Sequence, residues 1–109
     1  MKFNVLSIPP FDKQLKRLAK KYPSLKQEFS NLLTDLETHP EQGTPLGNAC
    51  FKIRIAIASK GKGKSGGARI ITNFVVIHKT VFLISIYDKS ETKNLTDKEL
   101  KELLKNVPL

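Results

Sequence analysis

The sequence predicts a single α+β domain with a small, mostly antiparallel β-sheet, two helices near the N-terminus and one near the C-terminus. Three observations predict this class. One short apolar run precedes two stretches with helical spacing, three strand-like runs follow them, and a strong helix-start signal comes last. The 109 residues suit one domain with one core. The expected order over residues 1–109 is therefore β-α-α-β-β-β-α.

The N-terminal part predicts one strand and a helical hairpin. The apolar run at 3–8 predicts a strand, which the two prolines after it end. Apolar residues at helical spacing predict a first helix over 11–22 and a second with its stripe at 25–36, separated by a proline. A further proline stops the second helix. The segment 41–49, with two glycines and a proline, predicts a connecting loop.

The middle of the chain predicts a three-stranded meander. Residues 51–58 alternate between a face of phenylalanine and isoleucines and a face that carries Lys52, Arg54 and two alanines. The runs 68–77 and 81–87 predict the second and third strands, joined by a tight turn. Both faces of these strands are apolar in their middles, so we expect the sheet to be covered at least in part on both sides.

The last helix is predicted by its start signal. Thr96 is placed as the N-cap and Glu99 as the third helical residue of a capping box, in which each side chain bonds the other residue's backbone N–H. Leu95 and Leu100 flank this pair at the spacing of a hydrophobic staple. The helix should therefore begin immediately after Thr96.

The charge of the chain is unevenly distributed. Lys and Arg total 19 and Asp and Glu total 10, which gives a net charge of +9. From Gln42 to Tyr87 there is no Asp or Glu. The basic residues of this window are Lys52, Arg54, Lys60, Lys62, Lys64, Arg69 and Lys79. Fields from like charges add, so this half should attract a polyanion, and a nucleic acid is favoured over a merely solvated surface.

Other partners and compartments are less well supported. No apolar run approaches the length needed to span a bilayer, so we expect no membrane partner, and the N-terminal run is too short for a secretory signal. Cys50 is the single cysteine, so no internal disulfide is possible. This cysteine usage suits a reducing cytoplasm, which is the expected location.

The densest basic stretch is the Lys–Gly segment, residues 59–69. It alternates lysine with glycine, and glycine resists the interiors of helices and strands, so the segment predicts a long cationic hairpin loop. Its Gly63-Lys64-Ser65 resembles the end of a phosphate-binding P-loop. That motif needs an earlier glycine where Ala58 stands and a helix where a strand is predicted. A nucleotide P-loop is therefore rejected.

Two stretches of sequence carry a resemblance to a known family. The runs F-K-I-R-I-A-I-A-S-K-G-K-G-K-S-G-G-A-R-I-I and L-I-S-I-Y-D-K-S-E, with P-x-F-D-K-x-L-K-x-L near the start, resemble toxins of the RelE/ParE superfamily. The resemblance is closest to the HigB-like branch of RelE-type mRNA interferases and covers nearly the whole chain. It implies a type II toxin–antitoxin system toxin with the element order given above.

The resemblance also implies an activity and partners. RelE-type toxins enter the ribosomal A site and cleave mRNA without metal or other cofactor: the RNA's 2′-hydroxyl attacks the adjacent phosphate, leaving a 2′,3′-cyclic phosphate and a 5′-hydroxyl. The expected partners are a cognate antitoxin, the ribosome and the mRNA in its A site. Since the basic face must be masked, we expect the antitoxin to be acidic where it binds.

The resemblance places five functional residues in this sequence: Lys52, Arg54, Arg69, Tyr87 and Lys89. RelE itself has an arginine at the place of Lys89, and it has a C-terminal tyrosine with no counterpart in this chain. RelE also lacks the long Lys–Gly segment. Lys60, Lys62 and Lys64 are therefore candidates from the residues alone, the last two for RNA binding together with Arg54.

Elementary chemistry gives the candidates roles. Arg69 ranks first, because a guanidinium stays charged and matches phosphate oxygens bidentately. Lysines crowded among cations favour the neutral form, so Lys52 or Lys60 is a candidate base for the 2′-hydroxyl proton. Lys89 or Tyr87 is a candidate acid for the leaving 5′-oxygen, although Tyr87 suits base stacking or a plain strand position equally well. The acid-free half has no donor cluster for a metal.

Two alternatives belong to other functional classes. The chain is also consistent with a non-catalytic basic module that binds RNA or the ribosome, such as a degenerate toxin, which binding without RNA scission would reveal. The shared fold also admits a ParE-type inhibitor of DNA gyrase, which a supercoiling assay would reveal. The cationic cluster favours RNA over gyrase.

Overall fold

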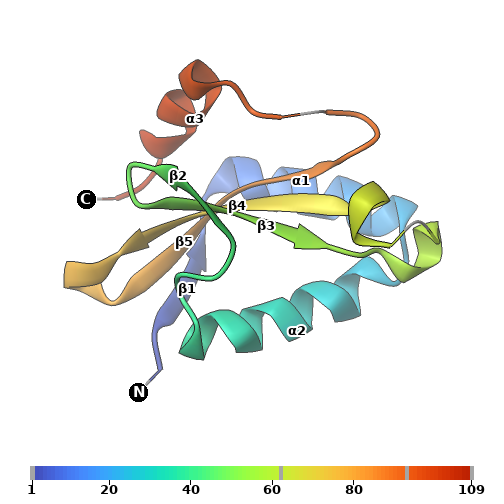
Figure 1. Cartoon of the computed structure of the whole chain (residues 1–109), viewed down its shortest axis with the longest axis horizontal. Helices are drawn as coiled ribbons and strands as arrows, with labels where there is room; N and C mark the ends of the chain where they lie inside the picture. The colour runs from blue at the N-terminus through green and yellow to red at the C-terminus, as the bar shows by residue number, and fades with distance from the viewer. Residues whose placement is uncertain (1, 62, 93, 109) are drawn as a thin grey trace.

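The structure is a computed structural model that describes residues 2–61, 63–92 and 94–108. In these residues the chain forms a five-stranded sheet, in the order β1-β5-β4-β3-β2, and three α-helices (Figure 1). The predicted α+β class and the mostly antiparallel sheet are confirmed. Among these described residues, no helix is both long enough and apolar enough to cross a bilayer.

The sheet has one parallel edge and an antiparallel remainder. The strands are β1 Asn4–Ser7, β2 Thr44–Gly47, β3 Cys50–Ile55, β4 Ala68–Val75 and β5 Thr80–Asp88. β3, β4 and β5 form the predicted antiparallel meander, and β1 pairs with β5 in parallel. The predicted strands at 51–58 and 68–77 are too long, because 58–60 and 76–78 turn into short 3₁₀-helices.

The predicted loop at 41–49 is partly wrong, since β2 lies within it. β2 pairs antiparallel with β3, with Thr44 opposite Lys52. Pro45 suggested a loop, but an edge strand accepts proline because one side of its backbone has no ladder hydrogen bond to donate. The observed order is therefore β-α-α-β-β-β-β-α, with one short edge strand more than the sequence indicated.

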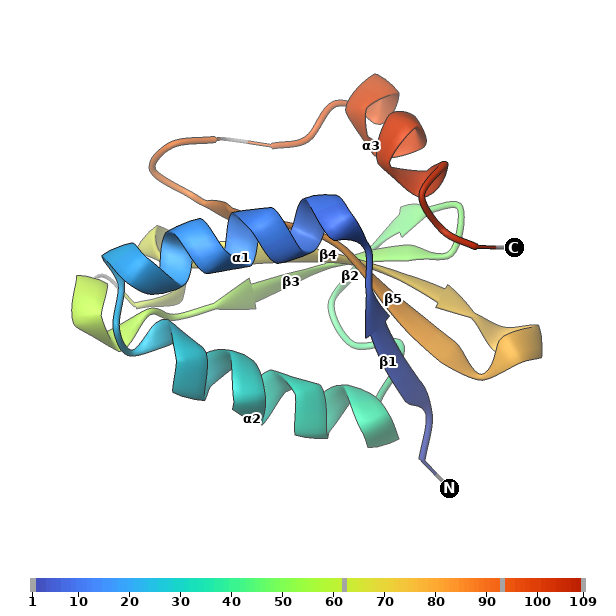
Figure 2. The ribbon, with the colours of Figure 1, turned by 180° about the vertical axis from the view of Figure 1, so that it is seen from behind.

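The three predicted helices are present. They are α1 Pro9–Lys21, α2 Leu25–Thr38 and α3 Asp97–Leu104. α3 begins where its start signal places it, and α1 begins two residues before the predicted 11–22. The capping box of α3 is present: Thr96 Oγ1 accepts from the Glu99 backbone N–H at 3.1 Å, and Glu99 Oε1 accepts from the Thr96 N–H at 3.0 Å. Figure 2 shows α1 crossing in front of the strands, whereas in Figure 1 it lies behind them. α1 therefore covers one face of the sheet.

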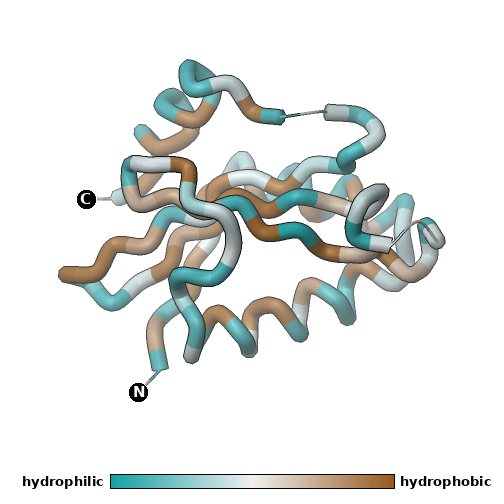
Figure 3. Tube along the Cα trace, in the orientation of Figure 1, coloured by the Kyte–Doolittle hydropathy of each residue, from teal (hydrophilic) through white to brown (hydrophobic). Residues whose placement is uncertain are grey.

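Alternation along the strands gives the sheet two unlike faces. Ile53, Ile70 and Ile86 pair across β3, β4 and β5, and each is 5% exposed or less. They pack with the apolar residues of α1 and α2, among which Phe11, Leu18, Leu25 and Leu36 are fully buried. Figure 3 shows hydrophobic residues along the strands and at the tip of the β4–β5 hairpin. The residues between the core isoleucines face the other way.

Candidate functional site

The face of the sheet opposite the isoleucines carries a row of polar side chains. The register places Arg54 opposite Arg69 and Arg69 opposite Tyr87, so one row crosses β3, β4 and β5. Directly opposite residues of an antiparallel pair share a face, with their Cβ atoms about 5 Å apart. Lys52 lies two residues before Arg54 on the same face. We call the surface of these four residues the cationic face.

Arg69 is the most buried cation of this face. The residue is 4% exposed, and its guanidinium donates to the Lys64 carbonyl at 2.8 Å and the Ala68 carbonyl at 3.1 Å. Within the described part of the chain, no carboxylate forms an ion pair with it. Burial and the nearby Arg54 lower the pKa of Arg69 from its ordinary value. Arginine nonetheless stays charged in proteins, so the face holds an uncompensated positive charge.

Tyr87 places a phenol beside that charge. The residue is 6% exposed, and among the described residues its hydroxyl has no hydrogen-bond partner. Burial raises the pKa of Tyr87, and the Arg69 charge opposes this in part. The phenol therefore remains protonated at neutral pH and offers an O–H donor. A buried polar group without a partner is unusual in folded proteins, which makes Tyr87 a candidate functional residue.

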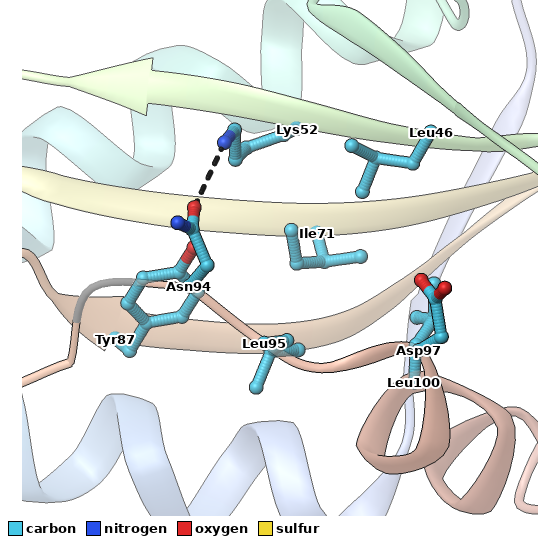
Figure 4. A pocket seen from close by; sticks show the side chains of 8 residues that line it. All are labelled: Leu46, Lys52, Ile71, Tyr87, Asn94, Leu95, Asp97 and Leu100. Carbon is cyan, nitrogen blue, oxygen red and sulfur yellow. Dashed lines mark hydrogen bonds between the residues drawn. The ribbon is translucent and has the colours of Figure 1, made fainter.

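A pocket adjoins the cationic face under the start of α3 (Figure 4). Its volume is about 230 Å³. The residues lining it are Leu46, Lys52, Ile71, Tyr87, Asn94, Leu95, Asp97 and Leu100. Lys52 Nζ donates to Asn94 Oδ1 at 3.2 Å, which joins β3 to the segment before α3. The pocket thus shares Lys52 and Tyr87 with the cationic face.

Lys60 is not part of this arrangement. Its ammonium forms an ion pair with Asp88 and donates to Ser90 Oγ at 3.0 Å, and the Lys60 and Asp88 side chains are 8% and 0% exposed. Asp88 follows Tyr87, so its side chain points to the helix-covered face, where the Tyr22 hydroxyl donates to it at 2.6 Å. Lys60, a candidate base from the sequence, is therefore held by Asp88 on the helix-covered face, apart from Lys52 and Arg69.

Asp88 collects several donors at once. Burial alone would raise its pKa, but hydrogen bonds from Lys60, Tyr22 and Ser90 outweigh the burial and hold the pKa of Asp88 well below its ordinary value. Asp88 is therefore a carboxylate at neutral pH, bonded to the end of α1 and to the Lys–Gly segment. No local pattern signals this cluster, because Lys60 and Tyr22 lie 28 and 66 residues from Asp88 in the sequence.

The Lys–Gly segment is fastened at both ends rather than loose throughout. At its start, Ala58 N–H donates to Glu28 Oε2 at 2.7 Å, and Ser59 N–H donates to Ser24 Oγ at 2.9 Å. At its end, Gly67 packs so closely that a Cβ atom would collide with the Ile55 carbonyl oxygen. The two ends therefore hold fixed positions beside α2 and β3.

The remaining candidates are placed as follows. Lys64 is exposed on the Lys–Gly segment, whereas Lys62 lies outside the described residues. Lys89 is half-buried, and its backbone N–H donates to the Gly67 carbonyl at 3.0 Å, so it follows directly on the strand that carries Tyr87. In the ranges 2–61, 63–92 and 94–108, no three His, Cys, Asp or Glu side chains are grouped to hold a metal.

Sequence reasoning missed Asn94 and Asp97. Both line the pocket, yet Asn94 stands in an irregular segment and Asp97 is the first residue of α3, where an acid is ordinary. No pattern in the sequence brings them to Lys52, which precedes Asn94 by 42 positions. Only the packing of α3 on the sheet reveals that these two residues lie near Lys52.

Comparisons with known proteins place the chain in a family. The model of the RelE toxin of the RelE/RelB toxin–antitoxin system matches residues 11–107. The Escherichia coli toxin RelE, in a mutant form in the free state, has a similar structure: TM-score 0.66 at 15% identity, covering 99% of this chain and 100% of that one.

A second solved structure shows the same fold. The toxin–antitoxin complex RelBE2 from Mycobacterium tuberculosis matches with a TM-score of 0.57 at 18% identity, covering 81% of this chain and 92% of that one. At these identities the two likenesses establish the fold, while the family match spans nearly the whole sequence. The chain therefore belongs to the RelE toxin family and is a toxin of a toxin–antitoxin system.

Proposed function

We propose that this toxin is a ribosome-dependent endoribonuclease that cleaves mRNA by attack of the 2′-hydroxyl on the adjacent phosphate. The observation that carries the proposal is the cationic face, on which Arg69 is buried without a carboxylate partner among the described residues, next to a phenol whose donor is unused. Uncompensated cations and donors are what a phosphoryl transition state needs, because its charge lies on the phosphate oxygens.

Charge stabilisation is the first task in this mechanism. Arg69 and Arg54 face the phosphate from neighbouring strands, and their forked donors suit its two non-bridging oxygens. The carbonyl bonds that hold Arg69 fix its position before substrate arrives, so little reorganisation accompanies the reaction. The side chains thereby supply the stabilising charge themselves, and the proposal includes no metal or other cofactor.

Two proton transfers complete the step. As the bond from the 2′-oxygen to phosphorus forms, the bond from phosphorus to the 5′-oxygen breaks, leaving a 2′,3′-cyclic phosphate and a 5′-hydroxyl. Lys52 is the proposed base for the 2′-proton, since it lies on the cationic face and Lys60 does not. Tyr87 or Lys89 is the proposed acid for the 5′-oxygen, because Tyr87 lies near the end of β5 and Lys89 directly follows that strand.

The proposed partners are a cognate antitoxin, the ribosome and mRNA in its A site. The M. tuberculosis structure is a toxin–antitoxin complex, which supports an antitoxin for this chain as well. An acidic antitoxin segment over Arg54 and Arg69 would compensate the charge that the toxin leaves unpaired. Lys64 and Lys62, on the neighbouring Lys–Gly segment, are proposed to contact RNA phosphates.

The test is a cleavage assay with programmed ribosomes. Purified toxin is incubated with ribosomes carrying a defined message, with naked RNA and matched metal-depleted samples alongside, and the RNA ends are mapped by primer extension. We expect cuts that need ribosomes, persist on metal depletion and vanish in Arg69→Ala. Lys13→Ala, which removes an exposed charge on α1, is the matched control and should cut normally.

The other outcomes point elsewhere. If the wild type binds ribosomes but does not cleave the mRNA, the proposal is wrong and the chain is a non-catalytic binding module. Absence of binding would direct the test to DNA gyrase and its supercoiling activity. A folded Arg69→Ala variant that cleaves at the wild-type rate would remove Arg69 from the mechanism.

A further inference from the structure

We propose that the pocket between α3 and the sheet binds one unpaired nucleobase of the RNA, with Asp97 selecting guanine. The inference rests on the proposed function, because it places the base beside the phosphate that the cationic face holds. The pocket and the cationic face share Lys52 and Tyr87. A nucleotide whose phosphate is bound at the cationic face therefore has its base within reach of the pocket.

The walls of the pocket suit a flat apolar ring. Four elements or segments contribute one aliphatic side chain each: Leu46 from β2, Ile71 from β4, Leu95 from the segment before α3, and Leu100 from α3. The volume of about 230 Å³ is below that of pockets for drug-sized ligands, which begin at about 300 Å³. A single heterocycle matches this size and lining, and proteins read unpaired RNA bases by hydrogen bonds to their edges once the bases are splayed out.

The Tyr87 hydroxyl is available to donate a hydrogen bond to a ligand. It is buried, protonated and without a hydrogen-bond partner in the described residues, and its side chain lines the pocket. A ligand that brings an acceptor satisfies this donor, and a ribose or phosphate oxygen next to a bound base is such an acceptor. Tyr87 thus lies where the proposed phosphate subsite meets the pocket.

The two ends of the pocket differ in chemistry. Figure 4 shows Lys52 and Asn94 together at one end, the Asp97 carboxylate at the other, and Ile71 between them. Lys52 belongs to the cationic face, so the sugar–phosphate side of a nucleotide lies at that end. The base edge is then directed to Asp97, with the Asn94 amide available where the Lys52–Asn94 bond opens.

An ionised carboxylate accepts hydrogen bonds and donates none. Guanine presents two neighbouring donors, N1–H and the N2 amino group, which match the two oxygens of Asp97. Adenine and cytosine offer one amino group beside an acceptor, and uracil has one N–H between two carbonyls. Guanine therefore fits best and uracil worst.

Asp97 also has an ordinary role that the test must separate. A carboxylate in the first turn of a helix is stabilising because it complements the helix dipole. Loss of that effect would weaken α3 and lower cleavage of every message equally. A role in base selection instead changes the ratio between messages, which a loss of stability does not.

The experiment compares four messages that differ only in the base flanking the cut. Single-turnover cleavage rates on programmed ribosomes are measured for the wild type, Asp97→Asn and the control Glu102→Gln, which removes an exposed α3 carboxylate outside the pocket. We expect the wild type and the control to cut the guanine message about tenfold faster than the uracil message, and Asp97→Asn to lose most of that ratio. An unchanged ratio in Asp97→Asn, or none in the wild type, would overturn the proposal.

A binding measurement separates this inference from the proposed function. The four nucleoside monophosphates are titrated into the ¹⁵N-labelled toxin, followed by the amide signals of Leu46, Leu95 and Leu100. We expect GMP to shift these signals at lower concentration than UMP, and Leu46→Trp, which fills the pocket from a partly exposed edge position, to abolish the shifts. If no message is cut but GMP binds, the cleavage proposal fails and the pocket stands. If GMP leaves these signals unchanged, the pocket proposal fails.

Discussion

Two buried cations lie at the two ends of the Lys–Gly segment, and their partners differ in charge. Lys60, near the start, lies in an ion pair with the buried carboxylate of Asp88 on the helix-covered face. Arg69, at the end, lies on the other face and donates to backbone carbonyls of Lys64 and Ala68. The Lys60 side chain is 8% exposed and the Arg69 residue is 4% exposed, so burial does not explain the difference between them.

The difference lies in charge compensation. The Lys60–Asp88 pair is neutral as a unit, so it fastens the segment without drawing a counter-ion. Carbonyl oxygens accept some of the Arg69 hydrogen bonds but cancel none of its charge, so its field remains available to an anion. The paired Lys60 fastens the segment, whereas Arg69, which donates to carbonyls, is the group proposed to bind an anion, so the two residues should respond differently to mutation.

The largest expected effect follows from removing the uncompensated charge. Arg69→Met keeps the aliphatic volume and deletes the guanidinium, and we expect ribosome-dependent cleavage to fall by about 10²–10³-fold, as when an enzyme loses one transition-state donor. Stability should change little or rise, because the charge of Arg69 is buried without an opposite partner. Cleavage rates and urea unfolding measure the two quantities. An Arg69→Met variant that is clearly destabilised in urea but still cleaves normally would show that Arg69 fastens the segment as Lys60 does.

The compensated pair should behave in the reverse way. Asp88→Asn leaves the Lys60 ammonium buried without a carboxylate, and we expect the free energy of unfolding to fall by about 3 kcal/mol. Glu102→Gln breaks the exposed pair with Lys105 and serves as the control, with an expected loss of about 0.5 kcal/mol or less. A loss in Asp88→Asn as small as that of the control would mean that the buried pair does not hold the segment.

The pH dependence of stability sharpens the same contrast. The pKa of Asp88 is lowered in the folded chain, so its contribution is complete above the unfolded-state value of about 4 and is lost as the pH falls below that value. We expect the wild type to lose stability from about pH 5 downward, and Asp88→Asn to lose less over the same interval. Glu99, whose pKa its bonds with Thr96 lower, contributes to both proteins and cancels in the comparison. Parallel pH curves for the two proteins would contradict the role of Asp88.

Local patterns predicted those parts of the fold that local physics decides. The alternation at Lys52 and Arg54 placed both side chains on one face, and Thr96 with Glu99 fixed the start of α3. β2 was missed because Pro45 argues for a loop in isolation, whereas pairing with β3 makes it a strand. That pairing is a tertiary effect, which propensity does not contain.

The candidate site was predictable to the same limit. Sequence and resemblance named Lys52, Arg54, Arg69 and Tyr87, and the register then brought them together. The acid-free window that drew attention to these cations ends one residue before Asp88, which turns to the other face and removes Lys60 from the set. Side-chain partners this far apart in sequence are decided by packing, so no local pattern reveals them.

The smallest expected effect links the charge of Arg69 to its neighbour. Burial raises the pKa of Tyr87 and the Arg69 guanidinium opposes that rise, so the phenol should titrate above its ordinary value of about 10. Arg69→Met removes the opposing charge, and we expect the pKa of Tyr87 to move further up. NMR of labelled tyrosine measures both proteins, and Tyr22→Phe assigns the signals, since the chain has two tyrosines. A pKa that stays constant or falls in Arg69→Met would show that the Arg69 charge does not reach the phenol, which would separate the two groups that the proposed mechanism joins.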